Sequence, residues 1–183
     1  MPVFRVTASL QARRRLGLTA TLVREIVARH AGEPMLIMAM DLDQIRHLAR
    51  ELDIPVITGA TPQDRRDRLY EQFRDGELTV VALSKVGNFA VDLPDALVAV
   101  QVSGTFGSRQ EEAQRLGRIL RPKPGLNQAH FDSLVSRDTV EQGFALRRQR
   151  FLCEQGNGYR VVDESLPPDV TEGSRSGHLR LFR

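Results

Sequence analysis

The sequence has one cysteine, no tryptophan, few aromatic residues and no long apolar run. The single cysteine, Cys153, excludes a disulfide within the chain and cannot build a metal site alone. The four histidines are scattered without ligand spacing, so the sequence predicts no metal site. No apolar segment approaches membrane-spanning length, and arginines interrupt the first apolar positions, which argues against a signal peptide. We therefore expect a cytoplasmic protein without a membrane partner.

The charge balance is mildly basic. The 183 residues carry a formal net charge of +3, and arginines cluster at 13–15, 65–68, 115–121 and 147–150. Such a balance permits nucleic-acid binding without requiring it. The scarcity of aromatic side chains argues against recognition by base stacking and favours contacts to backbone phosphates.

Apolar and amphipathic segments alternate from Pro34 onward. This alternation predicts an α/β fold, in which an open parallel sheet carries helices on both faces. Asp41 is expected to cap the first of these helices, and Thr61 is expected to cap the second, with Pro62 at its first position. The expected strands lie at 35–39, 55–58, 78–83, 97–102 and 128–135, and the helices at 42–52, 62–74, 108–121 and 138–155.

In such sheets ligands bind beyond the carboxyl ends of the strands. The loops at 58–63, 84–92 and 103–108 follow strands, so they should lie at that edge.

Both ends of the chain differ from this central part. Residues 1–33 read as a separate short piece, with strands at 3–6 and 16–21 and a helix from Thr21 to His30. How this piece packs stays open. Residues 163–183 are rich in proline, glycine and serine, which predicts a disordered tail. The expected boundaries are thus 1–33, 34–162 and 163–183.

A row of polar side chains lies on the predicted helix at 108–121. Gln114, Arg118 and Arg121 are spaced four and three residues apart, so they share one helix face. Guanidinium groups match the spread charge of a transferring γ-phosphate. A solvated basic helix, with arginines that complement the helix dipole, explains the spacing as well. Spacing alone leaves both readings open.

Three motifs in order resemble the second RecA-like domain of superfamily 2 helicases, closest to the XPB-type DNA helicases. Thr58-Gly59 with Gln63 and Arg66 is similar to the family's Gly-x-x-x-Gln-x-x-Arg segment. The stretch 84–94 resembles helicase motif V, and the stretch 104–123 resembles motif VI nearly letter for letter. The resemblance covers roughly residues 34–162. It implies a RecA-like open parallel sheet in a three-layer α/β/α arrangement.

The resemblance also implies roles for the matching residues. Arg118 and Arg121 would be arginine fingers that reach the γ-phosphate of ATP, and Gln114 would contact the phosphate or the attacking water. Without the motif context, Gln63 and Arg66 read as a solvated helix face and Ser84 as a simple turn. The remaining implied contacts are to nucleotide (Asp92, Arg115 and Gly117) and to the nucleic-acid backbone (Gly59, Gln63, Arg66, Ser84 and Lys85).

The first segment resembles a different part of the same family. Residues 15–21, followed by Arg24-Glu25, are similar to motif III and the start of the Arg-Glu-Asp element, which belong to the end of the first RecA-like domain. Thr19, Ala20 and Thr21 would be a remnant of this coupling motif. Ile26 stands where an acidic residue is expected, and the usual connecting segment is missing.

The chain contains neither a G-x-x-x-x-G-K-[ST] loop nor an Asp-Glu-x-His/Asp box. Arginine fingers only supplement a phosphate cradle and a Mg²⁺ ligand, so the chain alone should not turn over ATP. We expect the C-terminal half of an XPB-like ATP-dependent DNA helicase. Its partners would be DNA and a first RecA-like domain, in cis or in trans, that holds ATP and Mg²⁺. The alternatives are a non-catalytic nucleic-acid-binding or interaction module, and a decayed gene product.

Overall fold

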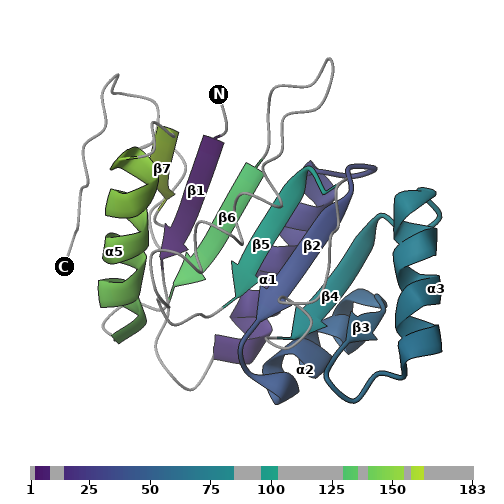
Figure 1. The fold of residues 1–183 in the computed structure, drawn as a ribbon. Helices are drawn as coiled ribbons and strands as arrows, with labels where there is room; N and C mark the ends of the chain where they lie inside the picture. Colours follow the sequence, from purple (N-terminus) through teal and green to yellow (C-terminus); the bar gives the residue numbers. More distant parts are fainter. Residues whose placement is uncertain are drawn as a thin grey trace.

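The computed structural model describes residues 3–8, 15–84, 96–102, 130–135, 140–154 and 158–162. Within these residues, seven strands form one parallel sheet in the order β3-β4-β2-β5-β6-β1-β7, shown in Figure 1. The predicted α/β class with an open parallel sheet is confirmed. The elements are β1 (Val3–Ala8), α1 (Arg15–Arg29), β2 (Met35–Ala39), α2 (Leu42–Leu52), β3 (Val56–Ile57), α3 (Gln63–Arg74), β4 (Val80–Ser84), β5 (Val98–Val102), β6 (His130–Val135), α5 (Val140–Glu154) and β7 (Gly158–Val162).

Helices cover both faces of the sheet. Apolar side chains of α1 and α2 form one buried cluster with β2 and β5, and those of α3 form a second cluster on the opposite face. Ala145 of α5 packs against Val135 of β6. Val135 lies four residues after Phe131, a member of the α3 cluster, so α5 shares the face of α3. This arrangement gives the predicted three layers.

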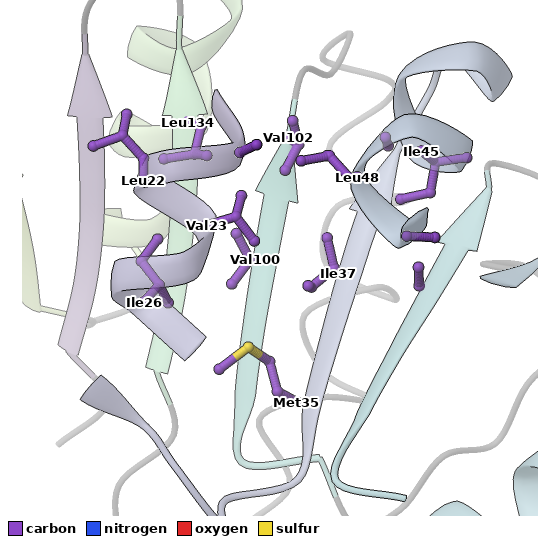
Figure 2. Packing of buried hydrophobic residues seen from close by; sticks show 14 of the residues in the cluster. Leu22, Val23, Ile26, Met35, Ile37, Ile45, Leu48, Val100, Val102 and Leu134 are labelled. Atoms are coloured by element: carbon purple, nitrogen blue, oxygen red, sulfur yellow. The ribbon is translucent and has the colours of Figure 1, made fainter. Parts of the chain in front are cut away.

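The core between α1, α2 and the sheet is shown in Figure 2. Val23 of α1 lies near Val100 of β5, while Ile45 and Leu48 of α2 lie over the neighbouring part of the sheet. Val23, Ile45, Leu48 and Ile37 are all completely buried. Strands β2 and β5 are buried along their whole length, because helices cover both of their faces. Continuous apolar runs such as Met35–Ala39 are therefore the sequence signature of these central strands.

The structure corrects the prediction for residues 16–21. They were expected to form a strand that ends in a turn, but they belong to helix α1. The short apolar run is ambiguous by itself. Ala20, Val23 and Ile26 are buried at intervals of three residues, and this is the helical period that places one face of α1 on the sheet.

The structure also answers how the first segment packs. Strand β1 lies between β6 and β7 and is parallel to both, with Val3 opposite His130 and Gly158. Residues 3–8 therefore contribute a strand to the same sheet as the rest of the described chain, and α1 contributes buried side chains to the same core as β2 and β5. Strand β7 was not predicted. The predicted helix at 108–121 and the predicted tail at 163–183 lie outside the described residues.

One of the two predicted helix caps is confirmed and one is wrong. The backbone N–H of Gln44 donates to Asp41 Oδ1 at 2.8 Å, as expected for a cap of α2. Helix α3 begins at Gln63 with Pro62 in the N-cap position and no side-chain cap. The hydroxyl of Thr61 instead accepts from the N–H of Thr58 at 2.9 Å. Thr61 Oγ1 bonds within the loop because the Thr58 N–H lies inside the turn and needs an acceptor.

None of the described helices is long and apolar enough to cross a bilayer.

Candidate functional site

The carboxyl ends of four neighbouring strands meet at one edge of the sheet. Ala39 at the end of β2 pairs with both Ser84 of β4 and Val102 of β5. Ile57 at the end of β3 pairs with Leu83, so Thr58 follows at the level of Ser84. The structure thus brings the β3–α3 loop (residues 58–62) and the end of β4 together at the edge where ligands bind in open parallel sheets.

The β3–α3 loop is held by its own threonines. The Thr58 N–H donates to Thr61 Oγ1, and the Thr61 N–H donates to the Thr58 carbonyl oxygen at 3.1 Å. The Ala60 N–H lies 3.3 Å from Thr58 Oγ1. Thr58 is buried, whereas Gly59 and Ala60 are exposed. The loop is therefore a turn with a fixed base and an exposed tip at Gly59.

Arg66 ties helix α3 to this loop. Its Nη2 donates to the carbonyl oxygens of Thr58 at 3.4 Å and Thr61 at 3.2 Å. The side chain is partly buried, and its Nε has no hydrogen-bond partner among the described residues. A cation that donates to backbone carbonyls fixes the loop in one shape. Arg66 thus acts on the loop itself in this structure.

Gln63 and Ser84 differ in accessibility. Gln63 is exposed, and its Nε2 donates to Asp67 Oδ1 one turn along α3 at 2.8 Å. Ser84 is only 1 % exposed, and within the described part of the chain its hydroxyl has no hydrogen-bond partner. Gln63 is available to an approaching ligand. The buried Ser84 hydroxyl is not accessible to a ligand in this structure.

Several predicted site residues have no described position. The nucleotide-site residues predicted from motifs V and VI, together with Lys85, lie outside the described residues: Lys85, Asp92, Gln114, Arg115, Gly117, Arg118 and Arg121. Thr19, Ala20 and Thr21, the predicted coupling remnant, all lie in α1. Ala20 is buried in the core and Thr21 is exposed.

Tyr70 lies one turn along α3 from Arg66 and is buried. Its hydroxyl has no hydrogen-bond partner within the described ranges. Burial raises the pKa of Tyr70 above 10.0; the nearby charge of Arg66 lowers the pKa and that of Asp67 raises it. The ring packs with Phe73 in the core on the α3 face of the sheet. Tyr70 therefore supports the helix that carries Gln63 and Arg66.

Sequence reasoning missed a second group of polar residues. His30, Glu33 and His130 have their ligand-type atoms within 4.8 Å of one another. The spacing of His30 and Glu33 is a weak local signal. His130 comes from a distant part of the chain, so only the fold reveals the group.

Comparison with known proteins identifies relatives of the chain. The ERCC3/RAD25/XPB C-terminal helicase family matches residues 21–176. The chain is 43% identical over 235 aligned positions to the DNA 3'-5' helicase XPB of Kineococcus radiotolerans, an alignment that covers 88% of this chain and 42% of the relative. The protein of the same name from Mycobacterium tuberculosis is 40% identical over 244 positions, covering 92% and 44%.

Two features of these matches concern length. The chain spans less than half the length of these two curated relatives. Both alignments are also longer than the 183 residues of the chain, so the relatives contain internal positions that this chain lacks.

The fold has counterparts among solved structures. The C-terminal domain of the DEAD-box protein Dbp5 matches with a TM-score of 0.71 at 15% identity, over 87% of this chain and 90% of that domain. A likeness at this level of identity concerns the fold alone. Together with the family match over residues 21–176, it shows that the chain belongs to the ERCC3/RAD25/XPB C-terminal helicase family and has the fold of the second RecA-like domain of superfamily 2 helicases.

Proposed function

We propose that this chain is the second RecA-like half of an XPB-like ATP-dependent DNA helicase. The observation that carries the proposal is the family match over residues 21–176, which includes all three sequence motifs at the strand ends. A first RecA-like domain, in cis or in trans, completes the ATPase site of the helicase. ATP in the cleft between the two domains draws them together, and hydrolysis releases them, which moves the protein along DNA.

In this proposal the nucleotide site is composite. The first domain supplies the phosphate cradle and the ligands of Mg²⁺, because this chain contains neither a P-loop nor an Asp-Glu box. Arg118 and Arg121 supply positive charge to the γ-phosphate, and Gln114 contacts the phosphate or the attacking water. Asp92, Arg115 and Gly117 add nucleotide contacts. An arginine finger is worth about 10³–10⁵ in rate, but only at a site that already binds nucleotide.

The β3–α3 loop is the proposed start of the DNA track. Gly59 lies at its exposed tip, where no side chain blocks the approach of a phosphate. Gln63 follows in the first turn of α3, whose amino end carries unpaired N–H groups that suit anions. Arg66 holds the loop from within through Thr58 and Thr61. Ser84 and Lys85 would extend the track along the same edge.

The length of the alignments favours a second candidate. Since the bacterial relatives contain internal positions that this chain lacks, the chain is shortened within the matched region. We propose that residues 1–33, which carry the motif III resemblance at 15–25, are a remnant of the end of the first RecA-like domain, joined directly to the second. A chain shortened in this way could serve as a non-catalytic DNA-binding module that uses no nucleotide.

An ATPase assay separates the two candidates. The isolated chain is tested with Mg²⁺ and single-stranded DNA, and then together with the first RecA-like domain of the Kineococcus radiotolerans relative. The helicase proposal expects no turnover by the chain alone and DNA-stimulated turnover by the mixture, lost in Arg118→Ala. Robust turnover by the chain alone contradicts it. A mixture without turnover, with DNA binding that falls with salt and ignores ATP, contradicts it as well and favours the binding module.

A further inference from the structure

Three side chains with metal-ligating atoms meet at the amino-terminal edge of the sheet. His30 directly follows α1, Glu33 precedes β2, and His130 opens β6. His30 Nδ1 lies 3.1 Å from Glu33 Oε2, and the rings of His30 and His130 are 4.7 Å apart between centroids. One ligand atom from each residue lies within 4.8 Å of the other two.

Backbone hydrogen bonds hold the three residues in place. The Glu33 N–H donates to the His30 carbonyl oxygen at 3.0 Å, across a turn in which Gly32 takes a φ of +83°. This positive φ suits glycine and brings Glu33 back toward His30. Pro34 accepts from Leu97, whose own carbonyl oxygen accepts from the His130 N–H at 2.8 Å. A short ladder of backbone bonds thus connects the turn after α1 to the first residue of β6.

We propose that His30, Glu33 and His130 bind a divalent transition-metal ion, with zinc as the best chemical match. Two imidazoles and a carboxylate are ligands that zinc accepts, with bonds of about 2.0–2.2 Å, and three protein ligands leave one position for water. Tetrahedral bonds of that length place ligand atoms about 3.3 Å apart. The His30–Glu33 pair, at 3.1 Å, is already close to this separation, and a ring nitrogen of His130 lies within 4.8 Å of both atoms. Hard cations such as Mg²⁺ prefer all-oxygen sites and suit this set poorly.

The position of the site gives it a structural role. It lies at the opposite edge of the sheet from the β3–α3 loop, so it is separate from the DNA contacts proposed for that loop. His30 is 8 % exposed, and Glu33 is 41 % exposed in its side chain, which leaves an entry path on the carboxylate side. An ion here clamps the end of α1 to β6. Because it binds the folded chain, it raises thermal stability by an amount that grows with the logarithm of the ion concentration divided by Kd.

The test uses Zn²⁺ and Co²⁺ on the full chain. Isothermal titration calorimetry with Zn²⁺ should show one ion per chain, and Co²⁺ should give the visible absorption of a low-symmetry site. Saturating Zn²⁺ should raise Tm. Glu33→Gln should lower Zn²⁺ affinity by at least about tenfold, since a first ligand matters no less than an outer partner. His47→Gln removes a histidine from α2, outside the site, and serves as the matched control.

Three outcomes would overturn the site. One is the absence of saturable Zn²⁺ binding by the wild-type chain. Another is a Glu33→Gln or His130→Gln variant that keeps the wild-type affinity for Zn²⁺. The third is a His47→Gln variant that loses as much Zn²⁺ affinity as the ligand variants do. Glu33→Gln keeps size and hydrogen-bonding ability at a partly exposed position, so this variant should stay folded, and circular dichroism verifies that it does. None of these readouts depends on ATP or DNA, so failure here leaves the helicase proposal untouched.

Discussion

Arg66 Nη2 lies 3.2 Å from the carbonyl oxygen of Thr61 and joins α3 to the loop before it. The family motif led us to expect Arg66 at the nucleic-acid backbone. In this structure its guanidinium instead holds the β3–α3 loop in one conformation. A second hydrogen bond, to the carbonyl oxygen of Thr58 at 3.4 Å, adds to this contact. The residue can therefore affect DNA binding through the position of Gly59 as well as through its charge.

Arg66→Ala should lower the free energy of unfolding by about 1–2 kcal/mol, because hydrogen bonds from a charged donor are lost at a partly buried position. It should also weaken DNA binding more than Arg65→Ala does. Arg65 is exposed on the same turn of α3, so both variants lose one positive charge. Urea unfolding and fluorescence anisotropy with labelled single-stranded DNA measure the two effects. Equal loss of stability in both variants would contradict the loop-holding role.

Thr61→Val should lower the free energy of unfolding by about 1–2 kcal/mol. The change keeps the shape of the side chain but removes the oxygen that accepts from the Thr58 N–H, and an N–H left without an acceptor is costly. Thr61→Ser restores the hydroxyl and should stay within about 0.5 kcal/mol of the wild type. Urea unfolding of the three proteins provides the comparison. If Val and Ser behave alike, the hydroxyl does not stabilise the loop.

Tyr70→Phe should leave stability at pH 7 unchanged or slightly higher, because the lost hydroxyl is buried without a hydrogen-bond partner in the described part of the chain. Burial raises the pKa of Tyr70 in the folded chain above 10.0. Above pH 10 the unfolded chain therefore loses this proton first, and wild-type stability falls as the pH rises toward the folded pKa. Tyr70→Phe lacks this contribution.

The measurement is urea unfolding of wild type and Tyr70→Phe at pH 7 and at several values above pH 10. Other groups titrate in both proteins. The difference between the two free energies of unfolding therefore reports the titration of Tyr70. The stability of Tyr70→Phe minus that of the wild type should therefore grow as the pH rises above 10. If this difference shrinks instead, the pKa of Tyr70 is not raised in the folded chain.

Asp41→Ala should destabilise the chain by about 1 kcal/mol, because Asp41 Oδ1 accepts from the Gln44 N–H at the start of α2. Asp43→Ala is the matched control: Asp43 is also acidic and in the first turn, but its side chain is 97 % exposed and pairs with Arg46 only at 4.0 Å. That change should cost less than about 0.5 kcal/mol. Thermal and urea unfolding give both values, and an equal cost for the two changes would exclude a specific cap.

Much of the fold could be read from local patterns. Apolar runs such as Met35–Ala39 and Val98–Val102 predicted central strands, because residues covered on both faces must all be apolar. Asp41 predicted the start of α2. The prediction failed at residues 16–21, where six residues were too few to separate a strand from a helix. It failed at Thr61 because the threonine oxygen could serve either the helix or the loop, and the loop geometry decided.

The candidate site was foreseen in the same local way. The order of segments placed Thr58, Gly59 and Ser84 at strand ends, and the fold brings them to one edge. What each side chain does there depends on its neighbours in space. Ser84 is buried and Arg66 bonds to the loop, although the motifs led us to expect both at the DNA backbone.

The class of fold, the central strands and the edge of the sheet that carries the candidate site followed from the sequence, because hydrophobic period and chain order encode these. The tertiary structure alone decided that β1 lies between β6 and β7, and that His130 meets His30 and Glu33. Parallel strands pair through backbone groups that every residue carries. Their choice of neighbour therefore depends on which faces the whole chain can bury together, and no local stretch of sequence contains that information.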